Sequence, residues 1–343
     1  EIHTSGWREG HDQGAKKVQC IFYDKIETRN YIVTQYGSVE NTFLQCIKDG
    51  ASIIFATESR MIDGALKVAA NYPYVKIFVC ALNIPSRLIH TYYPRMYEAK
   101  FICGAIAGTL TKTNTIGYIC KYPIYGAIAE INAFARGVQL TNPDAKVYLE
   151  WSTYDESTRA QDSLIQKGAD LISFREYNDK SKNRYKQFGL TQVNGNQLNT
   201  LTLPIWNWGT YYARIIDSIL DGTQDEEIEK TKKSLNYYWG ASSGVVDILY
   251  SQRLPRGVRY LGEILFKSLK TEKCNPFFNP EKGADGTYIW EDIDKALNIE
   301  DIINMDWLEE NIIGAIPKYD ELDSNVQHVV NKMGVSSSRE ESK

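Results

Sequence analysis

The sequence predicts an α/β protein built from two doubly wound lobes. Short apolar runs rich in β-branched residues alternate with longer segments of helical periodicity, which is typical of parallel sheets with helices on both faces. This alternation runs once to about residue 112 and begins again near Thr115. A chain of 343 residues is also long for one hydrophobic core and is of the size expected for two lobes.

The elements of the first run follow from apolar spacing and turn residues. Helices are predicted over 10–19, 38–50, 59–73 and 95–110, and strands over 51–57 and 74–82. The run ASIIFAT at 51–57 is continuously apolar, as expected of a buried strand. The helix over 95–110 carries small residues along one face and is suited to close packing. The opening stretch HTSGWREG, with Trp7, is interpreted as a strand-to-helix loop.

The second run repeats the pattern. Strands are predicted over 115–122, 145–151, 169–176 and 204–209, and helices over 126–143, 159–168 and 211–222. After residue 225 a charged, solvated stretch precedes a strand over 244–250, a helix over 259–270 and a hairpin over 277–290 with Gly286 in its turn. If these late elements return to earlier lobes, lobe 1 comprises 1–113 with about 240–268. Lobe 2 then comprises 114–239 with about 269–317, and 318–343 is a C-terminal tail.

Composition excludes several classes of protein. The net charge of −4 and the lack of a basic block argue against binding to nucleic acid. The longest apolar runs are shorter than the about 20 residues that span a bilayer. None of the six cysteines forms a CxxC pair, and unpaired thiols favour a reducing compartment. Cys80, Cys103 and Cys120 lie in apolar patterns and are predicted to be buried.

Motifs for catalysis are missing from the sequence. It has no GxSxG elbow, no P-loop lysine, no HExxH and no GxGxxG after a strand. The four histidines are too scattered to suggest a metal site, and no pair of carboxylates is singled out by spacing. We therefore expect a non-catalytic protein that needs no metal and no cofactor.

Candidate binding residues follow from the position of ligands at the carboxyl ends of strands in open α/β sheets. The residues selected by this rule are Trp7, His11, Glu58, Ser59, Asn83, Tyr125, Trp206, Trp208 and Trp239. Four tryptophans would thus line a cleft between the lobes, where aromatic rings with a few polar groups suit a flat ligand.

Each candidate also has a structural interpretation. Trp206 and Trp208 face the same way on an extended chain, either as a stacking platform or as a joint core plug. His11 follows Trp7 by one helical turn and is otherwise an ordinary surface histidine. Glu58 at a helix start is equally explained by the helix dipole.

Four segments resemble the basic membrane protein family of ABC-transporter solute-binding proteins, which includes purine nucleoside-binding lipoproteins. They are YEAKFICGAIAGTLTKTNTIGYI, INAFARGVQLTNPDAKVYLEW, YYWGASSGVVDI and NMDWLEENIIGAIP. The resemblance extends from about Gly6 to Pro317. It implies the type I periplasmic-binding fold, in which two lobes close by a hinge motion on a ligand, and an ABC permease as partner if the protein is exported.

The resemblance also implies a purine base or nucleoside as ligand, with Trp7 at the position of the family's stacking aromatic. The nucleoside binders carry Asp and Asn where this sequence has Thr4 and Arg8, and a lysine where it has WNWG. Base stacking is therefore better supported than ribose binding, and a free purine is as suitable as a nucleoside.

Two alternatives to an extracytoplasmic, membrane-associated binder remain open. Only Glu1 and Ile2 precede the opening loop, and no signal peptide or acylated cysteine is present, so we expect the natural polypeptide to be longer at its N-terminus. A cytoplasmic ligand-sensing module of a larger protein is the first alternative. A nucleoside-acting hydrolase is the second.

Overall fold

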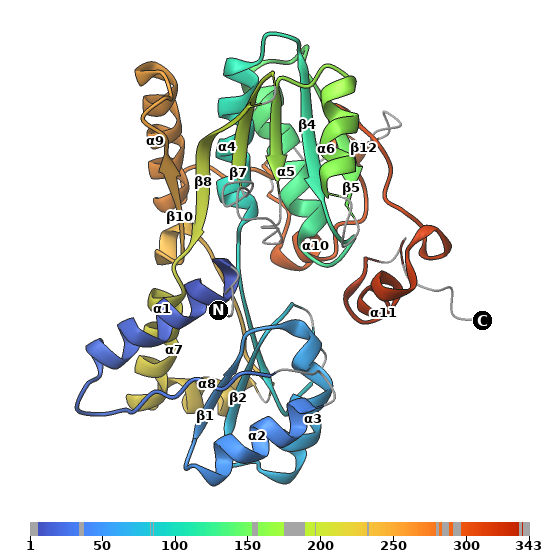
Figure 1. Ribbon diagram of the computed structural model, residues 1–343. Helices are drawn as coiled ribbons and strands as arrows, with labels where there is room; N and C mark the ends of the chain where they lie inside the picture. Colours follow the sequence, from blue (N-terminus) through green and yellow to red (C-terminus); the bar gives the residue numbers. More distant parts are fainter. Residues whose placement is uncertain are drawn as a thin grey trace. The chain divides into compact units, whose positions relative to one another are not determined.

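The computed structural model describes residues 6–33, 38–82, 84, 86–152, 157–174, 189–195, 197–231, 233–278, 281–282, 288–290, 296–335 and 338. The chain divides into two compact units (Figure 1). Unit 1 comprises Glu1–Pro94 with Trp206–Trp239, and unit 2 comprises Arg95–Ile205 with Gly240–Lys343. Within the described residues no helix is long and apolar enough to cross a membrane.

Unit 1 is built on a parallel sheet of four strands. In order across the sheet these are β1 (Ile53–Ala56), β2 (Lys76–Cys80), β3 (His90–Pro94) and β9 (Asn236–Trp239). Its helices are α1 (Gly6–Ile21), α2 (Val39–Lys48), α3 (Ile62–Asn71), α7 (Trp208–Leu220) and α8 (Thr223–Thr231). Helices α1 and α7 pack together, as do α2 and α3. The carboxyl ends of all four strands lie at one edge of the sheet, because the strands are parallel.

Unit 2 is built on a larger mixed sheet in the order β10-β8-β7-β6-β4-β5-β13. The strands are β4 (Thr115–Cys120), β5 (Lys146–Trp151), β6 (Leu171–Phe174), β7 (Gly189–Asn194), β8 (Gln197–Trp206), β10 (Val246–Tyr250) and β13 (Ile312–Ile313). Its helices are α4 (Tyr97–Leu110), α5 (Ala127–Thr141), α6 (Ser157–Gln166), α9 (Arg256–Lys270), α10 (Ile299–Ile303) and α11 (Ser324–Met333). A two-stranded ribbon pairs β11 (Glu281–Lys282) with β12 (Tyr288–Trp290).

Helices cover both faces of the unit 2 sheet. Tyr118 of β4 packs edge-on against Phe134 of α5, with ring centroids 5.2 Å apart. A Cβ atom on the neighbouring Gly117 would meet Leu164 of α6. Successive residues of a strand point to opposite faces, so α5 and α6 lie on opposite sides of β4. The expected doubly wound arrangement is confirmed here.

Helices α4 and α5 pack with their backbones in contact. A Cβ atom on Gly104 would lie 1.9 Å from the carbonyl oxygen of Phe134, and one on Gly137 would lie 2.0 Å from that of Phe101. Only glycine allows this approach. The close packing predicted for the small-residue face of the helix over 95–110 is therefore confirmed. The predicted burial of Cys80, Cys103 and Cys120 is confirmed as well.

Several elements differ from those predicted. Trp7 lies inside α1 rather than in a loop, and Trp208 begins α7 rather than extending a strand. The charged stretch after residue 225 lies largely in α8. The hairpin near 277–290 is confirmed by the pairing of β11 with β12, and its turn at Gly286 lies outside the described residues.

The lobe boundaries also differ from the expected ones. Strand β9 pairs with β3, so the segment up to Trp239 belongs to unit 1. Helix α4 packs on α5 and α9, so residues from Arg95 onward belong to unit 2 together with β10. Part of the expected C-terminal tail forms the helix α11. Such long-range pairings leave no local signal in the sequence.

Candidate functional site

Trp7 occupies the first turn of α1 at the carboxyl edge of the unit 1 sheet. Its ring is half-buried, and its Nε1 donates a 2.9 Å hydrogen bond to the carbonyl oxygen of Thr57, the residue after β1. This bond joins the start of α1 to the end of β1 and fixes the orientation of the indole.

Three further rings pack around Trp7. Trp206 lies at 5.2 Å, Trp208 at 5.1 Å and His11 at 4.9 Å between ring centroids, each in an edge-to-face arrangement. Edge-to-face pairs at these distances are attractive beyond their buried area. The two tryptophans lie far from Trp7 in sequence and still form one aromatic cluster with it. Trp208 begins α7, which packs on α1, and Trp206 ends β8 just before it.

His11 is buried beneath this cluster, with 4% of its surface exposed. Its ring stacks on Trp208 at 4.1 Å, and its Nδ1 hydrogen-bonds the hydroxyl of Tyr212. Burial lowers the pKa of His11 to about 3, so the imidazole is neutral at physiological pH. The sequence suggested a ligand contact or a surface residue. The structure shows that His11 is not a surface residue, because it is buried and packs against Trp7 and Trp208. Its contact with ligand remains a prediction.

A chain of hydroxyls determines which nitrogen of His11 carries the proton. Tyr212 contacts the hydroxyl of Tyr92 at 3.3 Å, and Tyr92 reaches the carbonyl oxygen of Ala56 at 3.3 Å. That carbonyl can only accept, so Tyr92 donates to it, Tyr212 donates to Tyr92, and His11 Nδ1 donates to Tyr212. We assign the Nδ1-protonated tautomer on this basis, because each hydroxyl in the chain then has an acceptor, while the buried Nε2 of His11 has no hydrogen-bond partner among the described residues.

Trp208 is a core plug, which is one of the two alternatives that its spacing left open. It is 1% exposed, and a Cβ atom on Gly10 or Gly14 of α1 would lie 3.2 Å or less from its side chain. Trp206, at the end of β8, is half-buried beside Trp7. The two residues therefore do not form a joint platform, because the chain turns from strand to helix between them.

Trp239 ends β9 at the same edge of the sheet and is half-buried. Its ring stacks on Tyr211 at 5.0 Å with an interplanar angle of 28°, and Tyr237 packs against it edge-on. The hydroxyl of Tyr211 accepts a hydrogen bond from the backbone N–H of Tyr93 and donates to the carbonyl oxygen of Tyr237. Trp239 is thus held by a ring that bridges β3 and β9.

The polar candidates of unit 1 follow β1 and β2. Glu58 and Ser59 are half-buried and follow Thr57 after the end of β1, and Glu58 makes no side-chain hydrogen bond that caps the turn it precedes. Burial, and to a lesser extent the charge of Glu58, raises the pKa of the Cys80 thiol, which ends β2. Asn83 lies outside the described residues.

In unit 2 the candidate Tyr125 lies in the loop after β4. It is half-buried, and its backbone N–H donates a 2.8 Å hydrogen bond to the carbonyl oxygen of Met333. The next residue, Gly126, has φ +76°, a conformation that favours glycine, and α5 begins directly after it.

The sequence reasoning missed two buried charged residues of unit 2. Lys100 of α4 is fully buried, and its Nζ donates to the carbonyl oxygen of Phe174 at 2.5 Å, at the carboxyl end of β6. Glu98 is 8% exposed and accepts a 2.6 Å hydrogen bond from the backbone N–H of Ala241. Both lie in α4, which the sequence analysis treated only as a helix suited to close packing. Two charged residues in a largely apolar helix were the signal that could have identified them.

The aromatic cluster is suited to binding the face of a flat ring. The described residues contain no group of three or more His, Cys, Asp or Glu side chains placed to hold a metal ion. Half-buried indoles with nearby carboxylate, hydroxyl and backbone groups provide stacking surfaces and hydrogen-bonding partners for a small ligand.

Known proteins match this chain in sequence and in fold. A purine-binding protein of Brucella abortus (strain 2308) is 29% identical over 296 residues, which cover 82% of each chain. An ABC transporter protein of Haloferax volcanii whose name gives glucose as its ligand is 28% identical over 263 residues, 73% of this chain and 64% of that protein.

An ABC transporter solute-binding protein of Conexibacter woesei aligns in structure with a TM-score of 0.56 and 11% identity, over 78% of this chain and 93% of that one. At this identity the likeness shows the fold alone, and that fold is the periplasmic-binding one. Residues 1–258 match the profile of the Bmp family, described as ABC transporter substrate-binding proteins of the PnrA-like type. Because this match covers well over half of its residues, the chain belongs to the Bmp family and is a solute-binding protein of the ABC-transporter type.

Proposed function

We propose that this protein captures a purine base or nucleoside by stacking the base on Trp7, and delivers it to an ABC permease. The observation that carries the proposal is the half-buried indole of Trp7, whose hydrogen bond to Thr57 holds it at the carboxyl edge of a parallel sheet. Ligands of open α/β sheets bind at this edge. The name of the Brucella abortus relative, a purine-binding protein, agrees with such a ligand.

The remaining candidates either contact the ligand or support Trp7. Trp206 and Trp239 offer further aromatic surface, and Glu58, Ser59 and Asn83 orient the polar edge of the base. Tyr125, in the loop that follows β4 of unit 2, is a further residue that contacts the ligand. His11 and Trp208 act behind Trp7, because both are buried.

The action of the protein in this proposal is binding alone, without catalysis. We place it outside the cytoplasm and associated with the membrane, since ABC substrate-binding proteins typically work there. Its partners are then the small ligand and the transporter's permease.

The test is a binding measurement by isothermal titration calorimetry against adenine, guanine, hypoxanthine, adenosine, inosine and glucose. We expect the purines to bind and glucose not to bind. Trp7→Ala should weaken purine binding by about 1–3 kcal/mol, or roughly five- to hundredfold in Kd, which is the usual contribution of base stacking on an aromatic ring.

Two control variants separate the parts of this effect. Trp7→Phe keeps a stacking ring but loses the hydrogen bond to Thr57, so its affinity should fall between those of the unaltered protein and Trp7→Ala. Tyr74→Ala changes a ring of unit 1 that is 70% exposed and should not change affinity. Glucose binding without purine binding, or full affinity in Trp7→Ala, would refute the proposal. Turnover of a nucleoside by the pure protein would refute its non-catalytic part.

A further inference from the structure

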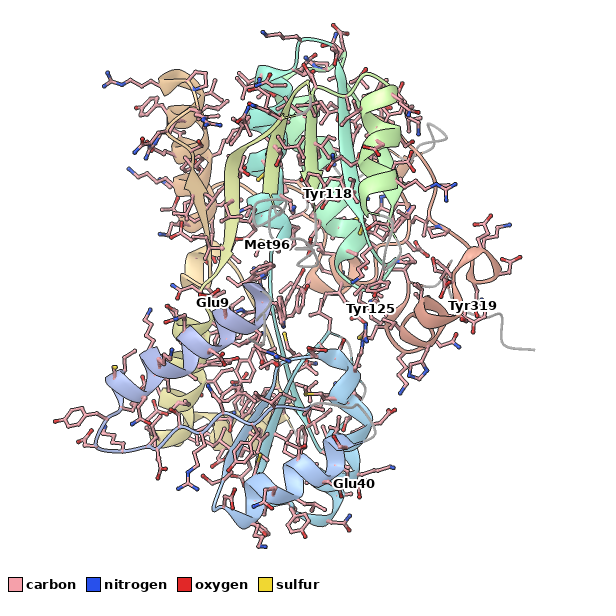
Figure 2. The ribbon with its side chains drawn as sticks, in the orientation of Figure 1. Glu9, Glu40, Met96, Tyr118, Tyr125 and Tyr319 are labelled. Carbon is pink, nitrogen blue, oxygen red and sulfur yellow. The ribbon has the colours of Figure 1, made fainter. Side chains whose placement is uncertain are left out.

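We propose that the C-terminal segment, residues 319–335, is a working part of the ligand site because it positions the loop 121–126 that carries Tyr125. This inference rests on the proposed function, in which Tyr125 contacts the ligand. Figure 2 shows Tyr125 on the side of unit 2 that carries Tyr319, at the start of the segment. The match to the family profile ends at residue 258, well before the segment begins.

The loop 121–126 occupies the place where the sheet topology predicts a ligand. Strand β4 pairs with β5 on one side and with β6 on the other. After β4 the chain forms β5 on one side of it and then returns to form β6 on its other side. The direction in which strands are added to the sheet therefore reverses at β4. In open α/β sheets the ligand crevice lies at the carboxyl ends of the strands at this reversal. The residues that follow β4 are those of the loop.

A short antiparallel pairing joins residues 123–125 of the loop to residues 333–335 of the segment. Tyr125 donates to the carbonyl oxygen of Met333 at 2.8 Å, and Val335 donates to that of Pro123 at 3.1 Å. Between them, Ile124 and Gly334 form an antiparallel bridge. This short pairing holds the shape of the loop through contacts with a distant part of the chain.

An apolar contact supports the pairing. Tyr122 of the loop forms one buried cluster with Val326 and Val330 of α11, and Ile124 and Leu322 pack against it. Val326 and Val330 are at most 1% exposed. The helix therefore covers the loop with side chains one turn apart, and burying two valines supplies a large part of the contact energy.

Further hydrogen bonds join the two ends of the segment and connect residues within it. The hydroxyl of Ser338 donates a 2.7 Å hydrogen bond to the carbonyl oxygen of Pro317, which joins the residues before and after the segment. Within it, the side chain of Gln327 donates to the carbonyl oxygen of Tyr319 at 2.9 Å. From the other side, Gly126 donates to the carbonyl oxygen of Ile303 at the end of α10.

The experiment uses Val330→Asp in the full chain, which places a carboxylate in the apolar cluster and should release α11 from the loop. The matched control is His328→Asp, which adds the same side chain at an exposed position of the same helix. We expect Val330→Asp to weaken purine binding by about tenfold, the value of one well-made hydrogen bond or small apolar contact. Hydrogen exchange should show loss of protection at the Tyr125 amide, and the control should retain both affinity and protection.

A double-mutant cycle with Tyr125→Ala distinguishes positioning from general damage. If the segment acts through Tyr125, the double variant should bind no more weakly than Tyr125→Ala alone. If Val330→Asp does not fold, Gly334→Ala replaces it, since a Cβ atom there would collide with the carbonyl oxygen of Val330 and displace the bridge.

If Val330→Asp or Gly334→Ala loses protection of the Tyr125 amide from hydrogen exchange but binds purine as tightly as the unaltered protein, this inference is wrong. The proposed function would not be affected by that result. Additive effects in the cycle would overturn the inference as well. Absence of purine binding by the unaltered protein would overturn it together with the proposed function.

Discussion

Two histidines of unit 1, the buried His11 and the half-buried His90, should make its stability fall as the pH decreases from about 7.5 to 5. Burial lowers the pKa of His11 to about 3, and burial together with the nearby charge of Lys76 lowers the pKa of His90 to about 4. The Nδ1 of His90 accepts a 3.0 Å hydrogen bond from the backbone N–H of Leu235, so this nitrogen carries no proton in the folded chain. In the unfolded chain both imidazoles return to the ordinary pKa of 6.5.

The size of the effect follows from linkage. At pH values below 6.5 the unfolded chain binds up to two protons that the folded chain does not bind, so acid favours unfolding. For each histidine the free energy of unfolding falls by about 2 kcal/mol at pH 5, or about 4 kcal/mol together. The stability contributed by the neutral histidines is therefore fully present above pH 6.5. It is lost as the pH falls toward the two folded pKa values.

One carboxylate opposes this trend. Burial raises the pKa of Glu98 in unit 2, so this group binds its proton more readily in the folded chain and favours folding as the pH falls. The two units must therefore be observed separately. Hydrogen exchange in urea at β1, β2 and β3 reports on unit 1, and exchange at β4 and β5 reports on unit 2.

The expected result is a slope for unit 1 that rises from about one proton at pH 6.5 to nearly two protons near pH 5. His11→Phe removes one titrating group, so its slope near pH 5 should be close to one proton even though the variant is less stable overall. A unit 1 stability that does not change over this range would refute the assignment of His11 and His90 as neutral in the folded chain. An unchanged slope in His11→Phe would refute the part that concerns His11.

Two further predictions concern packing in unit 2. Gly104→Ala should lower the free energy of unfolding, measured by urea unfolding, by more than about 3 kcal/mol, because its Cβ would collide with a backbone oxygen. The control is Gly257→Ala in α9, where a Cβ atom meets open space. In the same assay this variant should be neutral or more stable by up to about 1 kcal/mol. Gly240→Ala should expel the Glu98 carboxylate, which occupies the space that the new methyl group would take, and Glu98→Ala should restore much of the lost stability in the double variant. Destabilisation that is strictly additive would contradict this second explanation.

Local patterns in the sequence were sufficient for most of the elements. The apolar run that contains β1, the small residues of α4 and the alternation of strands and helices all depend on neighbours within about 20 residues. The choice of Trp7, Trp206 and Trp239 as candidates came from a rule about strand ends, and all three lie half-buried in unit 1. Their contact with ligand remains a prediction.

What the sequence did not predict depends on contacts between distant residues. His11 looked exposed because nothing near it indicates that Trp208 and Tyr212 will cover it. The bond from Lys100 to Phe174 joins residues 74 positions apart, and the C-terminal segment meets a loop about 210 residues earlier in the chain. Such pairings are selected by the tertiary fold, which overrides local propensity.

The pairing of β3 with β9 has a consequence for how the chain reaches its native state. Thr91 pairs with Asn236, and His11 meets Tyr212 over a separation of 201 residues. During synthesis the residues up to Pro94 therefore cannot complete unit 1 until the chain up to Trp239 has been made. Until then one edge of the sheet is unpaired and aromatic rings are unburied. Contacts of such long range fold slowly, because the entropy of closing the loop is lost before the contacts form. The intervening residues 95–205 are available earlier, so unit 2 begins to condense while unit 1 is still open to aggregation or to chaperones.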